Sequence, residues 1–257
     1  MSFQFAITRQ PAESYIDGIT TANLGRPEMP LARAQHTAYV QALTRAGLQV
    51  SVLPPTPAYP DSVFVEDAAI VEADFAVLSR PGANSRRGET ADMLPELAQR
   101  FTVHYQIEAP GTLDGGDICK VGTHYFLGVS QRTNPAGAQQ LAGFLSRHAF
   151  TSEIIDIRGM QGILHLKSAV NSLGGNTLLL DPRLANHPSF NSYRKLVVPL
   201  EEAYAANCLR LNEVVLVPAG FPVTMELVTN AGFTPVVMQV SEYHKMDGGL
   251  SCLSLRW

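Results

Sequence analysis

The sequence predicts an α/β protein that is assembled from several small mixed sheets. Short apolar runs typical of strands alternate with amphipathic helical stretches along the whole chain, and the order strand, strand, helix, strand recurs about every 50 residues. Alternation by itself favours one doubly wound sheet. Because the strands fall in pairs between the helices, several small sheets fit the pattern better. No linker divides the chain, so we expect residues 1–257 to form a single domain.

Two helices are predicted in the first half of the chain. The first covers Pro30–Ala46, carries Tyr39 and Leu43 on its apolar side and ends at Gly47. The second covers Glu89–Arg100. The strands of this half are expected at Phe3–Thr8, Leu48–Leu53, Val63–Glu66, Ala68–Val71, Phe75–Leu78 and Val103–Ile107.

The second half repeats the pattern with less regular helices. Full helices are expected at Pro135–Arg147 and at Pro222–Ala231, the latter closed by Gly232, with only a short helix at Ser189–Lys195 between them. The strands of this half are expected at Ile118–Val121, Tyr125–Val129, Ile154–Ile157, Ile163–Leu166, Thr177–Leu180, Pro235–Val240 and Leu250–Leu255.

Composition excludes several classes of protein. Of 257 residues, 46% are hydrophobic and the net charge is −4, so no surface for nucleic acid or for an anionic membrane is indicated. No apolar run reaches the ~18–20 residues of a membrane span, and no basic stretch followed by an apolar one marks a secretory signal. The three cysteines, Cys119, Cys208 and Cys252, have neither disulfide-framework nor metal-site spacing. We expect a cytoplasmic protein.

Cys252 is the candidate nucleophile among these cysteines. Gly248 and Gly249 precede it and allow a tight turn that can leave its sulfur accessible. In the strand expected after that turn, Cys252 would share one face with Ser254. The alternative interpretation is a buried structural cysteine, because free cysteine packs as a small hydrophobe.

His165 is the candidate general base. It is the one of seven histidines that lies inside an apolar run, Ile163–Ser168. On a strand, His165 and Lys167 would project from one face while Leu164 and Leu166 anchor the other. A hydrogen-bonded core histidine is the alternative. Because no second histidine has ligand spacing, we expect no metal.

Acidic residues gather in two short segments. Asp61, Glu66 and Asp67 surround a short apolar stretch, and adjacent Glu66 and Asp67 would point to opposite faces of a strand. Asp114 and Asp117 flank a Gly-Gly turn, for which an exposed Asx-turn is the alternative. That turn lacks a phosphate-loop pattern and aspartates repel phosphate, so we expect no nucleotide cofactor.

The charges indicate a substrate with two unlike ends. Carboxylates near apolar strands suit a cation, and a cysteine beside them suits an electrophilic carbon within that cation. Arg86, Arg87 and Arg132 lie in turn sequences and could hold a carboxylate, although solvated loop arginines are the commoner case. An arginine derivative would satisfy both sets of charges.

Together these segments resemble the guanidine-modifying superfamily of arginine deiminases and amidinotransferases, and within it the dimethylarginine dimethylaminohydrolase family. The resemblance spans nearly the whole chain, with the motifs in family order. The resembling stretches are Pro60–Asp67, Arg80–Thr90, Ile107–Asp117, Gly128–Asn134, His165–Ser168, Tyr204–Asn212 and Ser241–Arg256.

This resemblance implies a five-bladed α/β propeller of strand-strand-helix-strand repeats around a central channel that holds the active site. It implies Cys252 as nucleophile, His165 as general acid and base, and Asp114 as the carboxylate that orients the guanidinium and the imidazole. Many bacterial relatives carry glutamate where this chain has Asp114, so here a shorter side chain would have to hold the imidazole.

The resemblance also implies the substrate contacts. Glu66 and Asp67 would lie at the guanidinium with Asp61 nearby, and Arg86 and Arg132 would grip the α-carboxylate. The segment Asp17–Glu28 would form a lid hinged at Gly18 and Gly25, with the carbonyl of Ile19 near the α-amine.

The implied activity is hydrolysis of Nω-methylated arginines to citrulline and methylamine or dimethylamine through a covalent thiouronium intermediate. An arginine deiminase is disfavoured because those enzymes carry an extra helical insert. A hydrolase of citrulline or another ureido compound stays open, as does a non-catalytic protein that binds arginine analogues. A Cys–His peptidase is disfavoured because acids at the site oppose oxyanion formation. Assembly as a homodimer is left open.

Overall fold

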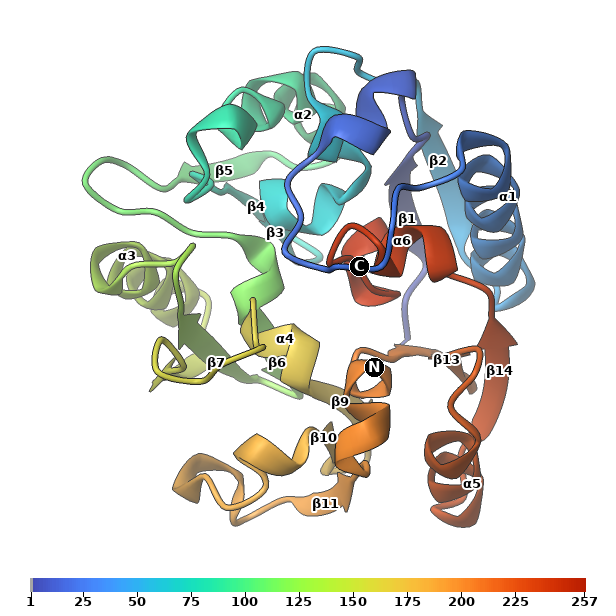
Figure 1. The fold of residues 1–257 in the computed structure, drawn as a ribbon. Coiled ribbons are helices and arrows are strands. Elements are labelled where there is room, and N and C mark those ends of the chain that lie inside the picture. The colour runs from blue at the N-terminus through green and yellow to red at the C-terminus, as the bar shows by residue number, and fades with distance from the viewer. Residues whose placement is uncertain (1) are drawn as a thin grey trace.

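Five three-stranded sheets surround a central axis in the computed structural model, which describes residues 2–257 (Figure 1). Four of these sheets follow one another along the chain as β3–β5, β6–β8, β9–β11 and β12–β14, and the fifth combines β15, β1 and β2. The strands are β1 Phe5–Arg9, β2 Gln49–Leu53, β3 Ala69–Val71, β4 Phe75–Leu78, β5 Val103–Gln106, β6 Ile118–Val121, β7 His124–Val129, β8 Thr151–Asp156, β9 Val170–Gly174, β10 Thr177–Leu180, β11 Arg194–Val197, β12 Leu209–Leu211, β13 Val214–Pro218, β14 Thr234–Met238 and β15 Leu255–Arg256.

Every sheet has the same internal order. Its first strand pairs antiparallel with the second, and the second pairs parallel with the third. A parallel pair requires a crossover, which is a helix in four of the five units and lies on the outside of the ring (Figure 1). These helices are α1 Met29–Arg45, α2 Glu89–Ala98, α3 Pro135–Arg147 and α5 Pro222–Asn230; the unit of β9–β11 instead has the short 3-10 turns η6 Pro182–Leu184 and η7 Pro188–Phe190. The predicted α/β fold of five repeated units is confirmed.

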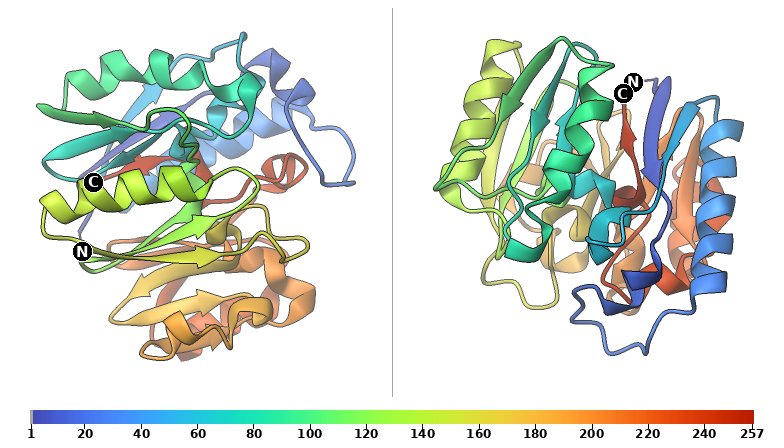
Figure 2. Two further views of the ribbon diagram at one scale, coloured as in Figure 1. Left: turned by 90° about the vertical axis from the view of Figure 1, so that its left-hand side faces the viewer. Right: turned by 90° about the horizontal axis from the view of Figure 1, so that it is seen from above.

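The two ends of the chain close the ring. β15 pairs with β1, so that Ala6 lies opposite Arg256 and Ile7 opposite Leu255. The backbone N–H groups of Gln4 and Phe5 also donate to the carbonyl of Trp257, at 2.9 and 3.0 Å. Figure 2 places the termini beside each other. One blade is therefore built from both ends of the sequence, which holds the C-terminal segment with Cys252 at the centre.

The outer helices form because their sequences combine caps with an apolar face. In α3 the side chain of Asn134 accepts the N–H of Gly137, and Pro135 occupies the first turn. Leu141 and Leu145 of the same helix are fully buried against the sheet. Each such leucine contributes roughly 1.5–3 kcal/mol of burial free energy. Among residues 2–257, no helix combines the length and the hydrophobicity that a membrane crossing requires.

Three predicted strands are wrong, and all three lie next to the central axis. Val63–Glu66 falls in the 3-10 turns η2 Pro60–Val63 and η3 Val65–Ala68. Ile163–Leu166 is irregular and leads into α4 Leu166–Ala169. Most of Leu250–Leu255 forms the 3-10 turn η9 Ser251–Leu253, with only β15 extended after it.

Their backbone groups are engaged by local turns and side chains instead of by a neighbouring strand. The N–H of Cys252 donates to the carbonyl of Gly249 at 3.2 Å, and the N–H of Leu166 donates to the carboxylate of Asp117 at 2.9 Å. The apolar patterns that predicted strands arise because these segments are buried on every side. Conversely, β9, β11, β12 and β13 were not predicted, and the short helix expected at Ser189–Lys195 is η7 followed by β11.

Candidate active site

Short helical turns at the inner ends of the blades meet on the central axis (Figure 1). η3 carries Glu66 and Asp67 and packs against both η9, which carries Cys252, and η5 Gly115–Asp117. α4 also packs against η5 and follows directly on His165. The topology therefore brings together segments that lie as many as 190 residues apart in sequence, such as Glu66 and Arg256.

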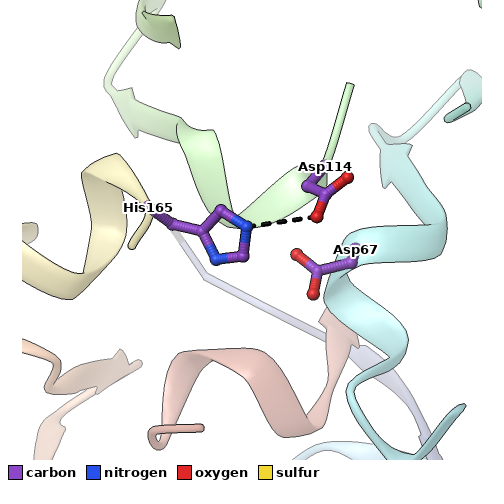
Figure 3. A group of neighbouring side chains, drawn as sticks. All are labelled: Asp67, Asp114 and His165. Carbon is purple, nitrogen blue, oxygen red and sulfur yellow. Dashed lines mark hydrogen bonds and ion pairs between the residues drawn. The ribbon is translucent and has the colours of Figure 1, made fainter. Parts of the chain in front are cut away.

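His165, Asp114 and Asp67 form a buried acid–base cluster (Figure 3). The Nε2 atom of His165 lies 3.1 Å from Oδ2 of Asp114, and one ligand atom from each of the three side chains lies within 4.8 Å of the others. Protein donors hold the carboxylates: the N–H of Gly82 donates to Asp114 at 2.8 Å, and that of Gly116 donates to Asp67 at 2.9 Å.

The charges around His165 favour its protonated form. Burial lowers the pKa of the imidazole, but Asp67, Asp117 and Asp114 outweigh that effect and raise the pKa of His165 to about 9. His165 therefore carries a proton at neutral pH and is poised as a general acid. The pair of His165 with Asp114 that the sequence predicted is present, and the shorter aspartate reaches the ring directly.

The glycines between Asp114 and Asp117 are required for space. A Cβ atom on Gly115 would lie 1.9 Å from the carbonyl oxygen of Glu66, and one on Gly116 would lie 2.8 Å from Nδ1 of His165. Neither glycine is among those with positive φ. Close approach of the backbone to the imidazole, and not a left-handed turn, is thus the reason for glycine here.

Replacing Gly116 by alanine is expected to displace the ring of His165 and to reduce turnover about 100-fold, because a displacement near 1 Å at a reacting group has an effect of that size. Steady-state turnover of the substrate proposed below measures the loss. Gly143→Ala is the matched control: apart from the backbone of α3 itself, nothing lies within 4 Å of its Cβ position, so activity should be unchanged. Equal activity of the two variants would contradict the packing of Gly116 on His165.

Asp67 and Arg86 belong to a second, ion-paired cluster. The buried guanidinium of Arg86 donates to Asp67 at 2.5 Å and to both carboxylate oxygens of Glu89 at 2.9 and 2.8 Å. Burial opposes the charge of Asp67, but Arg86 and His165 outweigh it and lower the pKa of the Asp67 carboxyl. Burial raises the pKa of Glu89 to about 7 even though Arg86 acts in the opposite direction. Asp67 is therefore the ionised carboxylate beside His165.

Glu66 points to a different set of partners. One carboxylate oxygen pairs with Lys167 and, at 3.2 Å, with Arg256, and the other accepts the hydroxyl of Ser251 at 3.0 Å. The prediction that Glu66 and Asp67 point to opposite faces of a strand is wrong in its element, since both lie in the 3-10 turn η3; there they contact different partners. The sequence predicted that Lys167 lies beside His165 on one face of a strand. Lys167 instead lies in α4 and pairs with Glu66.

Cys252 is buried beside these carboxylates, with 9% of its surface exposed. Its Sγ atom lies 3.9 Å from Nδ2 of Asn207 and from Oγ of Ser251. Burial, with further contributions from Glu66 and Asp67, raises the pKa of the Cys252 thiol to about 12. The thiol is therefore neutral at neutral pH. Its sulfur is less accessible than the Gly-Gly turn led us to predict.

In the turn before Cys252, glycines again allow the backbone to approach neighbouring side chains closely. A Cβ atom on Gly248 would lie 2.2 Å from the ring of Phe64, and one on Gly249 would lie 2.4 Å from the amide of Asn207. The left-handed residue of this turn is Asp247, with φ of 58°. The glycines thus bring the backbone of the cysteine loop against its neighbours.

Asp61 lies under the predicted lid. Its buried carboxylate accepts the N–H of Ile19 at 3.0 and 3.3 Å, and a Cβ atom on Gly18 would lie 2.5 Å from the same carboxylate. Burial raises the pKa of Asp61, while Arg86 and Arg132 act to lower it. Within residues 2–257 the half-buried guanidinium of Arg132 makes no hydrogen bond, which leaves its donors available to a ligand carboxylate.

The lid segment Asp17–Glu28 crosses beside the C-terminal turns (Figure 1). The N–H and the hydroxyl of Thr21 both donate to the carboxylate of Asp247, at 2.5 and 3.0 Å. Of the two predicted hinges, Gly25 is left-handed, with φ of 85°, whereas Gly18 is extended. The lid is therefore fastened to the loop that carries Cys252.

A cavity of about 470 Å³ opens between the lid and the axis. Its walls include Thr21 of the lid, Ser130 two residues before Arg132, Leu164 directly before His165, and, from the surroundings of Cys252, Asn207 and Gly249. A second cavity of about 590 Å³ is lined by Glu66, Lys167 and Arg256. The first cavity is lined by neighbours of Arg132, His165 and Cys252, but by none of these three residues and by no residue of the Asp114 segment. Its volume has room for an amino-acid substrate.

Several contacts at the site were not assigned from the sequence. Asn207 and Ser251 lie against the sulfur, Arg256 pairs with Glu66, and Glu89 pairs with Arg86. Asn207 lies in the resembling stretch Tyr204–Asn212, which was the available signal for it. Single polar residues such as Ser251 give no comparable pattern.

Comparisons with known proteins agree with this geometry. Residues 25–182, more than half of the chain, match the family model described as N,N dimethylarginine dimethylhydrolase, eukaryotic. The chain is 42% identical over 257 residues to the N(G),N(G)-dimethylarginine dimethylaminohydrolase of Pseudomonas aeruginosa, covering 99% of this chain and 100% of that protein.

Two solved structures are similar over essentially the whole chain. The enzyme from Pseudomonas aeruginosa, as a cysteine-to-serine mutant complexed with citrulline, superposes with a TM-score of 0.97 at 40% identity and covers 100% of both chains. A histidine-to-glycine variant of a dimethylarginine dimethylaminohydrolase, as an adduct with S-methyl-L-thiocitrulline, has a TM-score of 0.96 at 40% identity and covers 99% of this chain and 100% of its own. On fold, site and sequence, this chain belongs to the dimethylarginine dimethylaminohydrolase family.

Proposed function

We propose that this protein hydrolyses Nω-methylated arginines, both asymmetric dimethylarginine and monomethylarginine, to citrulline and dimethylamine or methylamine. One observation carries the proposal: a buried, neutral Cys252 thiol lies beside Glu66 and Asp67, and Asp67 in turn lies beside a protonated His165. Such a site gains a nucleophile only when a cation binds, and a guanidinium supplies both that cation and the carbon to be attacked. The citrulline complex and the thiocitrulline adduct of its relatives support the same substrate class.

The substrate would span the first cavity between two sets of charges. In our proposal the guanidinium lies at Asp67, with Glu66 and Asp61 adding negative charge, and the lid places the carbonyl of Ile19 near the α-amine. The α-carboxylate would lie at Arg132, whose donors are available, with Arg86 contributing charge from behind Asp67. Arg86 is already paired with Asp67 and Glu89, so Arg132 is the principal anchor.

The first half of the reaction would use His165 as an acid. Entry of the guanidinium lowers the pKa of the Cys252 thiol, and its proton leaves to water. The thiolate attacks the guanidinium carbon and forms a C–S bond. The C–N bond to the methylated nitrogen then breaks as His165 transfers its proton to the departing amine, which leaves a thiouronium on Cys252. Asp114 holds the imidazole during this transfer.

The second half would use the same imidazole as a base. Neutral His165 takes a proton from a water molecule, and the hydroxide formed attacks the thiouronium carbon. The C–S bond breaks and the proton of the added hydroxyl passes to the departing thiolate. Neutral citrulline then leaves, and Cys252 and His165 return to their starting state. These reaction steps need no cofactor.

Product analysis tests the proposal. The protein is incubated separately with asymmetric dimethylarginine, monomethylarginine, arginine and citrulline, and the amines and citrulline released are measured. We expect dimethylamine from asymmetric dimethylarginine and methylamine from monomethylarginine, each with one equivalent of citrulline. Ammonia as the sole product, formed from arginine or citrulline, would instead assign a deiminase or a ureido hydrolase. Binding of all four compounds without any product would assign a non-catalytic binding protein.

Removing the carboxylate anchor should affect binding more than chemistry. Arg132→Ala is expected to raise the KM for dimethylarginine roughly 10- to 100-fold with a smaller change in kcat, since a charge-assisted pair of this kind is worth about 1.5–3 kcal/mol. Arg147→Ala, at the exposed end of α3, is the control and should leave both constants unchanged. A KM unaltered by Arg132→Ala would place the α-carboxylate elsewhere.

We further propose that residues 1–257 act as one unit and that the protein works in the cytoplasm. The pairing of β15 with β1 supports the first point, because it ties both ends of the chain into one blade. The need for Cys252 as a free thiol supports the second, since reducing compartments preserve thiols. Homodimer formation stays a prediction that sedimentation would test.

A further inference from the structure

Asp117 is a fully buried carboxylate next to the catalytic cluster. Its Oδ1 atom accepts the N–H of Leu166, the residue directly after His165, at 2.9 Å. Its Oδ2 atom accepts the hydroxyl of Ser130 at 2.7 Å. Among residues 2–257 it makes no ion pair with lysine or arginine. A buried carboxylate without a cationic partner is costly, so its hydrogen bonds must matter to the site.

These two bonds join the histidine loop to the arginine turn. The hydroxyl of Ser130, which donates to Asp117, itself accepts the N–H of Arg132 at 3.0 Å and that of Thr133 at 3.2 Å. Asp117 thus lies between the segment that carries the general acid and the segment that carries the carboxylate anchor.

Asp114 belongs to the same hydrogen-bonded network as Asp117 and Ser130. The N–H of Asp117 donates to the carbonyl of Asp114 at 3.0 Å, and the N–H of Asp114 donates to Oγ1 of Thr133 at 3.0 Å. The carboxylate that orients His165 and the turn that carries Arg132 are therefore held in one hydrogen-bonded unit, with Asp117 at its centre.

Only an ionised carboxylate fits this position well. Both partners, the N–H of Leu166 and the hydroxyl of Ser130, are donors in the observed arrangement. An asparagine has one accepting oxygen, and its NH₂ group would face the second donor. Glycine at position 128 leaves room for this carboxylate, since a Cβ atom there would lie 3.0 Å from Oδ1 of Asp117.

We propose that Asp117 is a positioning residue for the reaction: its carboxylate fixes the distance between His165 and Arg132, so that the general acid and the carboxylate anchor engage one substrate together. This inference rests on the proposed function. It assigns to Asp117 a role through other residues and no contact with substrate.

The charge of Asp117 also acts on His165. The charged groups facing this imidazole are Asp67 from η3, which is paired with Arg86, and Asp114 and Asp117 from the η5 segment. Removal of one negative charge destabilises the imidazolium, so the pKa of His165 must fall. A carboxylate remote from the imidazole that served only the stability of the fold would not move this pKa.

Asp117→Asn tests the proposal with two readouts. The first is the pKa of His165 in the free protein, from NMR titration of its ring signals, which are assigned by their loss in His165→Asn. The second is the steady-state kinetics on dimethylarginine. We expect the His165 pKa to fall below that of the wild type and kcat to drop roughly 10- to 100-fold, as for other residues that orient a catalytic group. Glu202→Gln is the matched control, because this buried carboxylate likewise accepts backbone N–H groups and a hydroxyl, at the start of α5. It should change neither readout.

Either a wild-type His165 pKa or a wild-type kcat in Asp117→Asn would overturn the proposal. Ser130→Ala provides an independent test if Asp117→Asn does not fold, since it removes one bond and keeps the charge. We expect it to raise KM with the His165 pKa unchanged, and an unaltered KM would overturn the link to Arg132. Because the titration needs no substrate, it separates this inference from the proposed function: a wild type that forms no citrulline refutes the function, while a His165 pKa unmoved in Asp117→Asn refutes the positioning role.

Discussion

Cys252→Ser is expected to reduce citrulline formation from dimethylarginine by at least about 1,000-fold. A hydroxyl is far harder to ionise than a thiol, and even the Cys252 thiol requires the substrate cation, because burial and neighbouring acids raise its pKa to about 12. The measurement is the rate of citrulline and dimethylamine release at saturating substrate. Turnover within tenfold of the wild type would remove Cys252 from the mechanism.

Two controls separate this effect from damage to the fold. Cys119→Ala removes another buried thiol and should leave the rate unchanged, since Cys119 lies in the core between the sheets and its pKa is raised to about 11 by burial. Binding of citrulline to Cys252→Ser, followed by calorimetry, should persist because the carboxylates and Arg132 are intact. The cysteine-to-serine mutant of the Pseudomonas aeruginosa enzyme was solved in complex with citrulline.

His165→Asn should block both halves of the reaction, and a change of leaving group separates them. With dimethylarginine we expect no burst of dimethylamine and a kcat lower by about 100- to 10,000-fold, since the amine cannot leave without a proton. With an analogue whose leaving group is a thiol, which departs without protonation, one equivalent should be released and the reaction should then stop. Stopped-flow detection of the released thiol measures this burst. Continued turnover of either compound would contradict the dual role of His165.

The pH dependence of the wild type follows from the same residue. The acidic neighbours raise the pKa of His165 to about 9, so the proton needed by the leaving amine is present at neutral pH and is lost as the pH rises through about 9. The rate of dimethylamine release in a single turnover should fall over that range. A rate that falls instead near the ordinary histidine pKa of ~6.5 would contradict the charge environment described for His165.

The helices and the repeat could be predicted from the sequence because their signals are local. The bounds of α3 agree with the prediction, since a proline in the first turn, an apolar stripe and a positive charge in the last turn all lie within Pro135–Arg147. Pairing of β15 with β1 could not be predicted from such signals. It joins residues about 250 positions apart and depends on the curvature accumulated over five units.

The segments at the active site were the hardest to predict, for a physical reason. Around His165 and Cys252 the backbone is buried and hydrogen-bonded to side chains from other blades, so its apolar residues follow neither a strand nor a helix period. Residue types at the site were nevertheless predictable, because nucleophile, base and acids are few in this chain. Their pairing was not: Arg86 binds Asp67 and Glu89, and Lys167 binds Glu66.

The most direct test of the central claim is to trap the covalent intermediate. Wild-type protein is mixed with excess asymmetric dimethylarginine, quenched with acid at intervals from milliseconds to seconds, digested and examined by mass spectrometry. We predict a thiouronium adduct on the peptide that contains Cys252, formed together with one equivalent of dimethylamine and lost when the substrate is exhausted. Steady release of citrulline and dimethylamine with no adduct at any time, or with an adduct on Cys119 or Cys208, would contradict the account.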